Sequence, residues 1–415
     1  MATIFAIVYL IALCIASYRR PILGLVLAAG SYLVGALVGG NEEGSWLSVV
    51  GPLLCFALCA SRAAASGAFR RYRIETLDVV MALIFLALFW STMYSEYPEV
   101  SIGYALRYLL LGSSFYYFAK LSSFSYSDKE RLLSDYLWGS VLGGLVFAVT
   151  SLAMNASASQ YFMRLTLGES SAIPLAVYLG QALVAIFALL VRGQPRGAAI
   201  FLACAIPPVG FAFLATNTRS VVIGLCLSVI VLFASAISKL SKRSMWMVVA
   251  IAAFGLGGFA YLYESHPETI SRLVSASTRI STGSLGESEG ERVTAWLAAW
   301  DTFTQSPLLG IGAGSFMEKY GLYPHNSLLE LSAEIGVLGA VLFLFFLVNC
   351  LLSAISQIRR GDGALPAMFM FHLIVAMVSM AFWMHKLLFL SAATLIAYGS
   401  THLNRADRAA SSIKP

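Results

Sequence analysis

The sequence predicts an all-α, polytopic integral membrane protein. Of its 415 residues, 59% are hydrophobic and 12% are charged, and the mean hydropathy is +0.80. Apolar runs of membrane-spanning length recur along the whole chain, and the runs at 220–237 and 337–352 are apolar all round. A helix of a water-soluble protein has one apolar stripe, whereas a helix surrounded by lipid or by other helices lacks a polar face.

Hydropathy predicts about 12–13 transmembrane helices. Residues 1–17 lack a basic start and a small-residue cleavage site, so we expect the first apolar segment to be retained. The long connection at 264–333 separates N-terminal transmembrane helices at 1–263 from C-terminal transmembrane helices and a short cytoplasmic tail at 334–415, within a single membrane domain. The candidate spans are 2–18, 22–39, 46–66, 75–93, 101–120, 134–153, 172–191, 198–215, 220–238, 245–263, 334–356, 364–383 and 387–402.

The distribution of basic residues predicts the orientation of these spans. Most Lys and Arg residues gather in alternate loops, which the positive-inside rule assigns to the cytoplasmic side. Seven of the remaining eight lie on or near the opposite face, and one lies within a span; they are Arg107, Arg164, Arg219, Arg272, Arg279, Arg292, Lys319 and Lys386. Cations gathered outside the cytoplasm indicate an anionic substrate. The formal net charge of +6 is scattered over short loops, so we expect no nucleic-acid partner.

The loop at 264–333 contains a predicted amphipathic helix. In the segment 291–303, Val293, Trp296, Leu297 and Trp300 recur at helical spacing. We expect this helix to lie on the membrane surface with its aromatic rings among the lipid headgroups.

Two arginines on this face are candidates for binding phosphate. Arg219 stands at the start of an apolar helix, where it could alternatively reach toward lipid headgroups. Arg292 opens the amphipathic helix beside Glu291, with which it could instead pair. A guanidinium group presents a fork of N–H donors that matches phosphate oxygens, so both arginines fit the recognition of a lipid-linked diphosphate.

His325 is the candidate general base. It follows Pro324 at the start of an apolar helix and could alternatively be a structural histidine. An imidazole near neutral pH suits the removal of a proton from a hydroxyl nucleophile. Asn326, Arg164 and Lys319 are further substrate-binding candidates on the same side. Arg107, inside a span, fits either ligand contact or a hydrogen bond between helices.

The sequence predicts neither a metal site nor a cofactor. The acidic residues of the loop show no metal-ligand spacing, so fixed cations would supply the positive charge. The glycine-rich run at 310–314 lacks the strand–loop–helix setting of a nucleotide site, which favours a tight turn.

Three motifs resemble those of the O-antigen ligase and polymerase superfamily of bacterial envelope glycosyltransferases. Thr218-Arg219-Ser220 is similar to an arginine at a helix start in that family. Arg292-x-x-x-Trp296-x-x-Ala299, followed by the run 307–312, resembles its loop signature. His325-Asn326-Ser327, leading to Glu334-Ile335-Gly336-x-x-Gly339, resembles its histidine motif. Together the motifs cover roughly residues 210–355.

The resemblance implies a fold of about 12 transmembrane helices with a periplasmic loop in the bacterial inner membrane. It implies a donor glycan on undecaprenyl diphosphate, held by Arg219 and Arg292, with His325 as the general base. Transfer would be inverting and metal-independent. Lipid diphosphate is already a good leaving group, so positioning, one base and fixed positive charge suffice.

Three activities remain open at this point. A ligase would transfer finished O-antigen to lipid A-core, whereas a polymerase would use a second lipid-linked O-antigen or exopolysaccharide unit as acceptor. A transporter or flippase for a lipid-linked glycan could use the same arginines. However, its cations would be expected near the membrane midplane, between paired interrupted helices. Of the three, we favour the ligase. The sequence identifies no protein partner.

Overall fold

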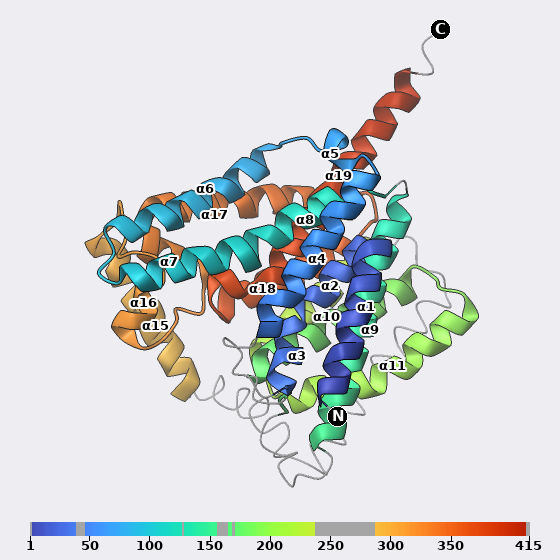
Figure 1. Cartoon of the computed structure of the whole chain (residues 1–415), viewed down its shortest axis with the longest axis horizontal. Helices are drawn as coiled ribbons and strands as arrows, with labels where there is room; N and C mark the ends of the chain where they lie inside the picture. The colour runs from blue at the N-terminus through green and yellow to red at the C-terminus, as the bar shows by residue number, and fades with distance from the viewer. Residues whose placement is uncertain are drawn as a thin grey trace. The chain divides into compact units, whose positions relative to one another are not determined.

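The computed structural model describes residues 2–38, 46–126, 128–155, 165–167, 171–236 and 287–411. Every regular element in these ranges is a helix, and the described residues contain no strand (Figure 1). The prediction of an all-α polytopic membrane protein is therefore confirmed.

Ten helices of the described residues are apolar enough to match predicted spans. Three shorter apolar segments lie at Thr3–Arg19, Ala364–Val378 and Lys386–Ser400. Seven are long enough to cross a membrane: Trp46–Ala65 (α4), Thr76–Met93 (α6 with η1), Lys129–Met154 (in α9), Ala172–Val191 (α10), Arg196–Ala215 (α11), Arg219–Ala236 (α12) and Ser327–Arg359 (α17).

Two predicted spans are interrupted helices. The span at 22–39 is divided at Gly30 into α2 (Pro21–Ala29) and α3 (Ser31–Leu37). The span at 101–120 comprises α7 (Pro98–Arg107), the π-helix η2 (Tyr108–Ser113) and α8 (Ser114–Ser123). The predicted span at 245–263 lies outside the described residues.

The chain forms two compact units, and each is built from separate stretches of sequence. The first comprises Met1–Cys55, Leu133–Leu285 and Gln357–Phe371, and the second comprises Phe56–Leu132, Gly286–Ser356 and His372–Pro415. The predicted division at 263 and 333 follows membrane and loop segments instead, and it stays a prediction.

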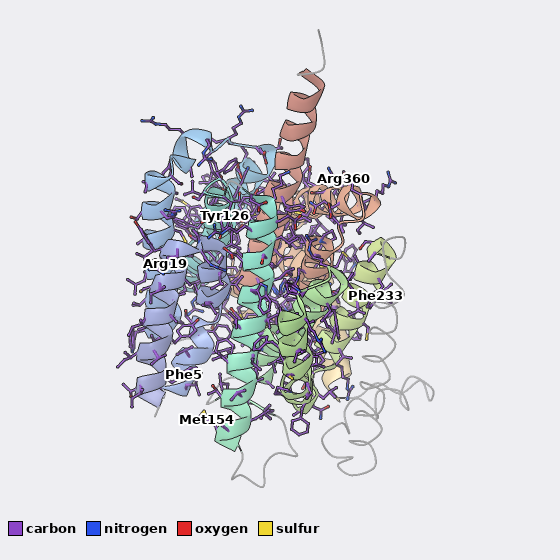
Figure 2. All side chains as sticks on the ribbon, turned by 90° about the vertical axis from the view of Figure 1, so that its right-hand side faces the viewer. Phe5, Arg19, Tyr126, Met154, Phe233 and Arg360 are labelled. Atoms are coloured by element: carbon purple, nitrogen blue, oxygen red, sulfur yellow. The ribbon has the colours of Figure 1, made fainter. Side chains whose placement is uncertain are left out.

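Helix α10, in the first unit, is the most buried of the membrane-length helices in the described residues. Of its 18-residue apolar stretch, 89% is buried. It packs against α11 and α12. Tyr178 on α10 donates a hydrogen bond to the Val26 carbonyl at 2.7 Å, and Gln181 donates to Ser140 at 2.6 Å. These bonds satisfy polar groups that lipid cannot satisfy. In the same unit, Arg19 lies at one end of α1 (Ala2–Arg19) and Phe5 lies towards the other (Figure 2).

Aromatic side chains form part of the core of the second unit. Tyr108 stacks on Phe382 with ring centroids 5.2 Å apart, and Phe343 meets the same ring edge-on at 5.4 Å. These rings join η2, α17 and the short helix η4 (Phe382–Met384). Helix α8 packs along α19 (Lys386–Ser411), and α6 packs against α7. The remaining elements of this unit include α5 (Ala68–Arg71), α15 (Glu287–Gln305) and α16 (Ser315–Tyr320).

Candidate functional site

His325 lies in the second unit, in the short connection between α16 and α17. Its backbone has a conformation that residues other than glycine rarely adopt. Its φ is 54°, in the left-handed region. The following residue, Asn326, caps α17, because its side-chain oxygen accepts hydrogen bonds from the backbone N–H groups of Leu328 at 3.0 Å and Leu329 at 3.1 Å. Pro324 is buried on the other side. The chain on either side of His325 thus supports a conformation that costs roughly 1–3 kcal/mol.

The environment of His325 keeps its imidazole neutral. Burial lowers the pKa of His325 from 6.5, and the charge of Arg292 lowers it further. The Nδ1 atom is enclosed and has no hydrogen-bond partner among the described residues. A neutral imidazole can accept a proton, which a general base must do.

Arg292 reaches this site from α15. It is half-buried, and Trp296 follows one helical turn later with its indole Nε1 enclosed and without a hydrogen-bond partner among the described residues. Ala299, a further turn along, is buried in an apolar cluster with Phe316 and Ala333. The face Arg292–Trp296–Ala299 therefore turns inward, which brings the guanidinium close enough to influence His325.

The opposite face of α15 is exposed and apolar. Leu297 is 60% exposed and Trp300 is 53% exposed, as expected for a helix that rests on a membrane surface. Trp296 was predicted on this same face, but its indole nitrogen is enclosed. Helical spacing alone did not separate Trp296 from its neighbours because it lies on the border between the two faces.

The glycine-rich run at 310–314 is a tight connection that docks on a kink in α17. The kink lies at Ile335 and at Gly336, whose φ of 67° favours glycine. It frees the carbonyls of residues 333 and 334, and these accept hydrogen bonds from the N–H groups of Ile311 at 3.0 Å and Gly312 at 2.9 Å. A Cβ on Gly310 would lie 2.4 Å from the backbone of residue 334. The glycines here allow close approach of two backbones.

Two buried carboxylates of α17, Glu330 and Glu334, were not among the predicted site residues, and Glu334 was quoted only as part of the histidine motif. Glu330 accepts hydrogen bonds from the Tyr104 hydroxyl and from the backbone N–H of Phe382, the latter at 3.0 Å. Glu334, one turn along α17, accepts from the backbone N–H groups of Gly314 and Phe316. Both are almost fully buried. The signal was available, since acidic residues inside an apolar segment are rare and have specific partners.

The other candidates in the second unit lie in different settings. Arg107 ends α7 and is exposed, and its guanidinium carbon lies 5.2 Å from the centre of the Trp383 ring. Lys319 is exposed beside the ring of Tyr320 at 5.7 Å. Arg164 lies outside the described residues.

Arg219 belongs to the first unit, where it opens α12 as predicted. The turn before it contains a second left-handed residue, Asn217, with φ 53°. Asn217 is 4% exposed, and its side-chain oxygen has no hydrogen-bond partner among the described residues. Arg219 is therefore presented by a strained polar turn, like His325.

The described residues contain no group of three or more His, Cys, Asp or Glu side chains arranged to hold a metal ion. Metal-independent chemistry stays a prediction. The charged group that acts on the neutral imidazole of His325 is the guanidinium of Arg292.

The segment that contains these residues is similar to a known protein family. Residues 198–344 match the family model described as O-antigen ligase. This segment of the chain is similar to the O-antigen ligase family. This segment contains Arg219, Arg292 and His325, so the resemblance to the O-antigen ligase and polymerase superfamily is confirmed. No curated protein matches the chain. Within the second unit, the matched segment includes α15, α16 and the kinked start of α17.

Proposed function

We propose that this multi-pass membrane protein is an inverting glycosyltransferase of the O-antigen ligase type. It moves a glycan from undecaprenyl diphosphate to a hydroxyl of lipid A-core at the periplasmic face of the bacterial inner membrane. One observation carries the proposal: a neutral, half-buried imidazole at His325 beside the guanidinium of Arg292, inside the O-antigen ligase segment.

In the proposed reaction, the acceptor hydroxyl attacks the anomeric carbon opposite the diphosphate. A carbon–oxygen bond to the acceptor forms while the bond to the diphosphate oxygen breaks, and the diphosphate keeps the electron pair. The hydroxyl proton passes to a ring nitrogen of His325. Because attack and departure occur on opposite faces of the sugar, the configuration inverts without a covalent enzyme intermediate.

Arg292 has two roles in this proposal. In the free enzyme, its charge helps to keep His325 neutral and ready to accept a proton. When the donor binds, the diphosphate neutralises that charge, so His325 becomes more basic as the reaction begins. Arg219 is proposed as a second cation on the diphosphate. Arg107, Asn326, Lys319 and Arg164 are proposed to contact the substrates.

The decisive experiment is reconstitution of the full chain with a defined undecaprenyl-diphosphate-linked glycan, with lipid A-core and a second lipid-linked unit as competing acceptors. Transfer to lipid A-core is expected. Elongation of the lipid-linked unit would identify a polymerase instead. Movement of the glycan across the bilayer without transfer to either acceptor would identify a flippase and overturn the proposal.

The same assay tests the metal-independent mechanism. Transfer is expected to continue at an unchanged rate in excess EDTA, because cationic side chains supply the positive charge that a divalent ion would otherwise provide. Loss of transfer that is restored by adding a divalent ion would contradict this mechanism. A parallel assay with a metal-dependent nucleotide-sugar glycosyltransferase confirms that the chelator is effective.

A further inference from the structure

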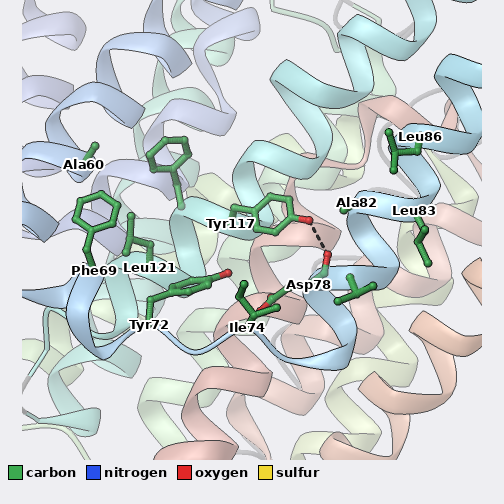
Figure 3. A pocket seen from close by; sticks show the side chains of 12 residues that line it. Ala60, Phe69, Tyr72, Ile74, Asp78, Ala82, Leu83, Leu86, Tyr117 and Leu121 are labelled. Atoms are coloured by element: carbon green, nitrogen blue, oxygen red, sulfur yellow. Dashed lines mark hydrogen bonds between the residues drawn. The ribbon is translucent and has the colours of Figure 1, made fainter.

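The second unit contains a cavity of about 680 Å³ that the proposed reaction does not use. It lies among α4, α5, α6 and α8, and Figure 3 shows the side chains that line it. Its volume is within the range of roughly 300–1,000 Å³ typical of small-molecule sites. The lining comes entirely from the stretch 60–121, far along the chain from His325.

The lining of the cavity is mostly apolar, and its polar residues Asp78 and Tyr117 lie between apolar side chains on either side (Figure 3). Asp78, Ala82 and Leu86 line it from successive turns of α6. The Tyr117 hydroxyl donates a hydrogen bond to the backbone carbonyl of Asp78 at 2.6 Å (Figure 3). The eight helical steps from Asp78 to Leu86 span about 12 Å at 1.5 Å per residue. This is close to one leaflet of a hydrocarbon core that is about 30 Å thick.

Between α4 and α6, exposed arginines alternate along the sequence with residues that line the cavity. Phe69, Tyr72 and Ile74 line the cavity, whereas the intervening arginines at 70, 71 and 73 are exposed. The positive-inside rule places this loop on the cytoplasmic side. Three exposed cations therefore lie next to lining residues in the sequence, on the side that the positive-inside rule assigns to the cytoplasm.

The positive charge of Lys120, which lies close to Asp78, is already paired with two carboxylates. Lys120 is 1% exposed, and its ammonium group lies 2.7 Å from Asp78 and 3.0 Å from Glu75. The exposed arginines are the remaining groups that can meet an anion arriving from the membrane, and Arg71 also donates a hydrogen bond to the Ser66 carbonyl at 2.8 Å.

We propose that this cavity binds one acyl chain of an anionic phospholipid of the cytoplasmic leaflet, with the lipid phosphate at Arg70, Arg71 and Arg73. The mostly apolar lining suits an acyl chain, and the exposed arginines next to Phe69, Tyr72 and Ile74 in the sequence suit the phosphate of an anionic headgroup. The length of the apolar stripe matches a chain that stays within one leaflet. This site is independent of the proposed transferase chemistry at His325.

Native mass spectrometry of the full-length protein with phosphatidylglycerol and phosphatidylcholine tests the proposal. The natural protein is expected to retain one phosphatidylglycerol in preference to phosphatidylcholine. Each arginine replaced by glutamine should reduce this preference by up to about fivefold. The triple variant Arg70→Gln, Arg71→Gln, Arg73→Gln should therefore show almost no preference for phosphatidylglycerol over phosphatidylcholine. The matched control replaces Arg359 and Arg360, a basic pair elsewhere in the chain, by glutamine. It should keep the preference for phosphatidylglycerol.

The acyl chain is tested separately. Ala82→Trp should fill the cavity and abolish retention of both lipids, whereas Leu142→Trp, on the exposed surface of α9 (Lys129–Asn155), should change nothing. A phosphatidylglycerol with a photoreactive acyl chain should label residues 69–86 of the natural protein, which tests the site without a substitution. Labelling spread evenly over other spans would overturn the proposal. So would an unchanged preference in the triple glutamine variant, or displacement by undecaprenyl phosphate at an equal or lower concentration.

Discussion

Two charged clusters in the second unit are built on opposite electrostatic principles. At the Lys120 cluster, one buried ammonium group is paired with two carboxylates at 2.7 and 3.0 Å. At His325, a basic imidazole lies beside a second basic group, Arg292, and the neighbouring charge lowers its pKa. The first arrangement pairs opposite charges, whereas the second places two groups together that repel each other when both are protonated.

The difference separates a structural charge from a functional one. A buried ion pair mainly holds its own helices together, and removal of one partner leaves an uncompensated charge. The His325 site is unfavourable in itself, because it combines left-handed backbone, an enclosed Nδ1 without a partner among the described residues, and a neighbouring cation. Such local costs are typical of functional sites. An anion bound near Arg292 would offset part of them.

The largest expected effect is the loss of transfer on removal of the imidazole. His325→Asn should lower the rate of glycan transfer by about 10²–10⁴-fold, the usual contribution of a general base. Asparagine tolerates positive φ, so the fold should be kept. The measurement is transfer in reconstituted membranes, with donor binding measured alongside.

His325→Ala is the companion variant. It removes the same nitrogen but places a less tolerant residue at φ 54°. Equal loss of transfer in both variants, with donor binding retained, supports the base. Substantial transfer by either variant would remove His325 from the mechanism.

The second prediction concerns the structural cluster. Lys120→Met should lower the free energy of unfolding by about 3–5 kcal/mol, because it leaves two carboxylates near one another without their cation. The measurement is thermal unfolding in detergent. Adding Glu75→Gln and Asp78→Asn to the same chain should restore much of the stability, because no uncompensated charge remains. If the single variant were as stable as the natural protein, the cluster would not hold this region together.

The sequence predicted the regular spans but not their interruptions. The apolar runs that became α10, α11 and α12 depend only on composition and length, which hydropathy measures. The interruptions occur where distant segments pack: a Cβ on Gly30 would lie 2.8 Å from the Phe147 ring, and Tyr108 of the π-helix at 108–113 stacks on Phe382. The kink at Gly336 depends on a loop that docks there from residues 306–312. Those contacts are between distant parts of the chain, so no local pattern contains them.

In the candidate site too, a sequence pattern predicted some features, and contacts between distant segments determined the others. The positive-inside rule predicted Arg292 and His325 on one side of the membrane, and in the structure the charge of Arg292 acts on His325. Glu330 was missed although it is an acidic residue in an apolar helix. Its partners, Tyr104 and Phe382, come from distant segments. The role of Trp296 also depended on which neighbours α15 would meet.

The third prediction tests the shape of the cation. Arg292→Lys keeps the charge but loses the fork that can bind two phosphate oxygens. One lost charge-assisted hydrogen bond should lower kcat/KM by about tenfold. Arg219→Lys should have a similar effect if both arginines hold the diphosphate. Full activity in both lysine variants would contradict that assignment, and Arg359→Lys provides a control at a basic residue outside the site.

The smallest expected effect is a change in pH dependence, and it bears most directly on the contrast between the two clusters. The base must be neutral, and burial together with Arg292 lowers the pKa of His325 from 6.5. In the natural protein, kcat/KM should therefore stay flat above pH 6.5 and fall only at lower pH. Arg292→Gln removes one of the two causes, so the pKa should rise and the acidic fall should move to higher pH, whatever the remaining activity.

The control for this measurement is Arg359→Gln, which removes a cation elsewhere and should leave the profile in place. An acidic fall that does not move in Arg292→Gln, or that moves to lower pH, would mean that Arg292 does not set the protonation of His325. In the natural protein, kcat should fall at a higher pH than kcat/KM. The bound diphosphate neutralises Arg292 in the complex and thereby raises the pKa of His325. A structural histidine would show no such separation, because its protonation would not depend on the donor.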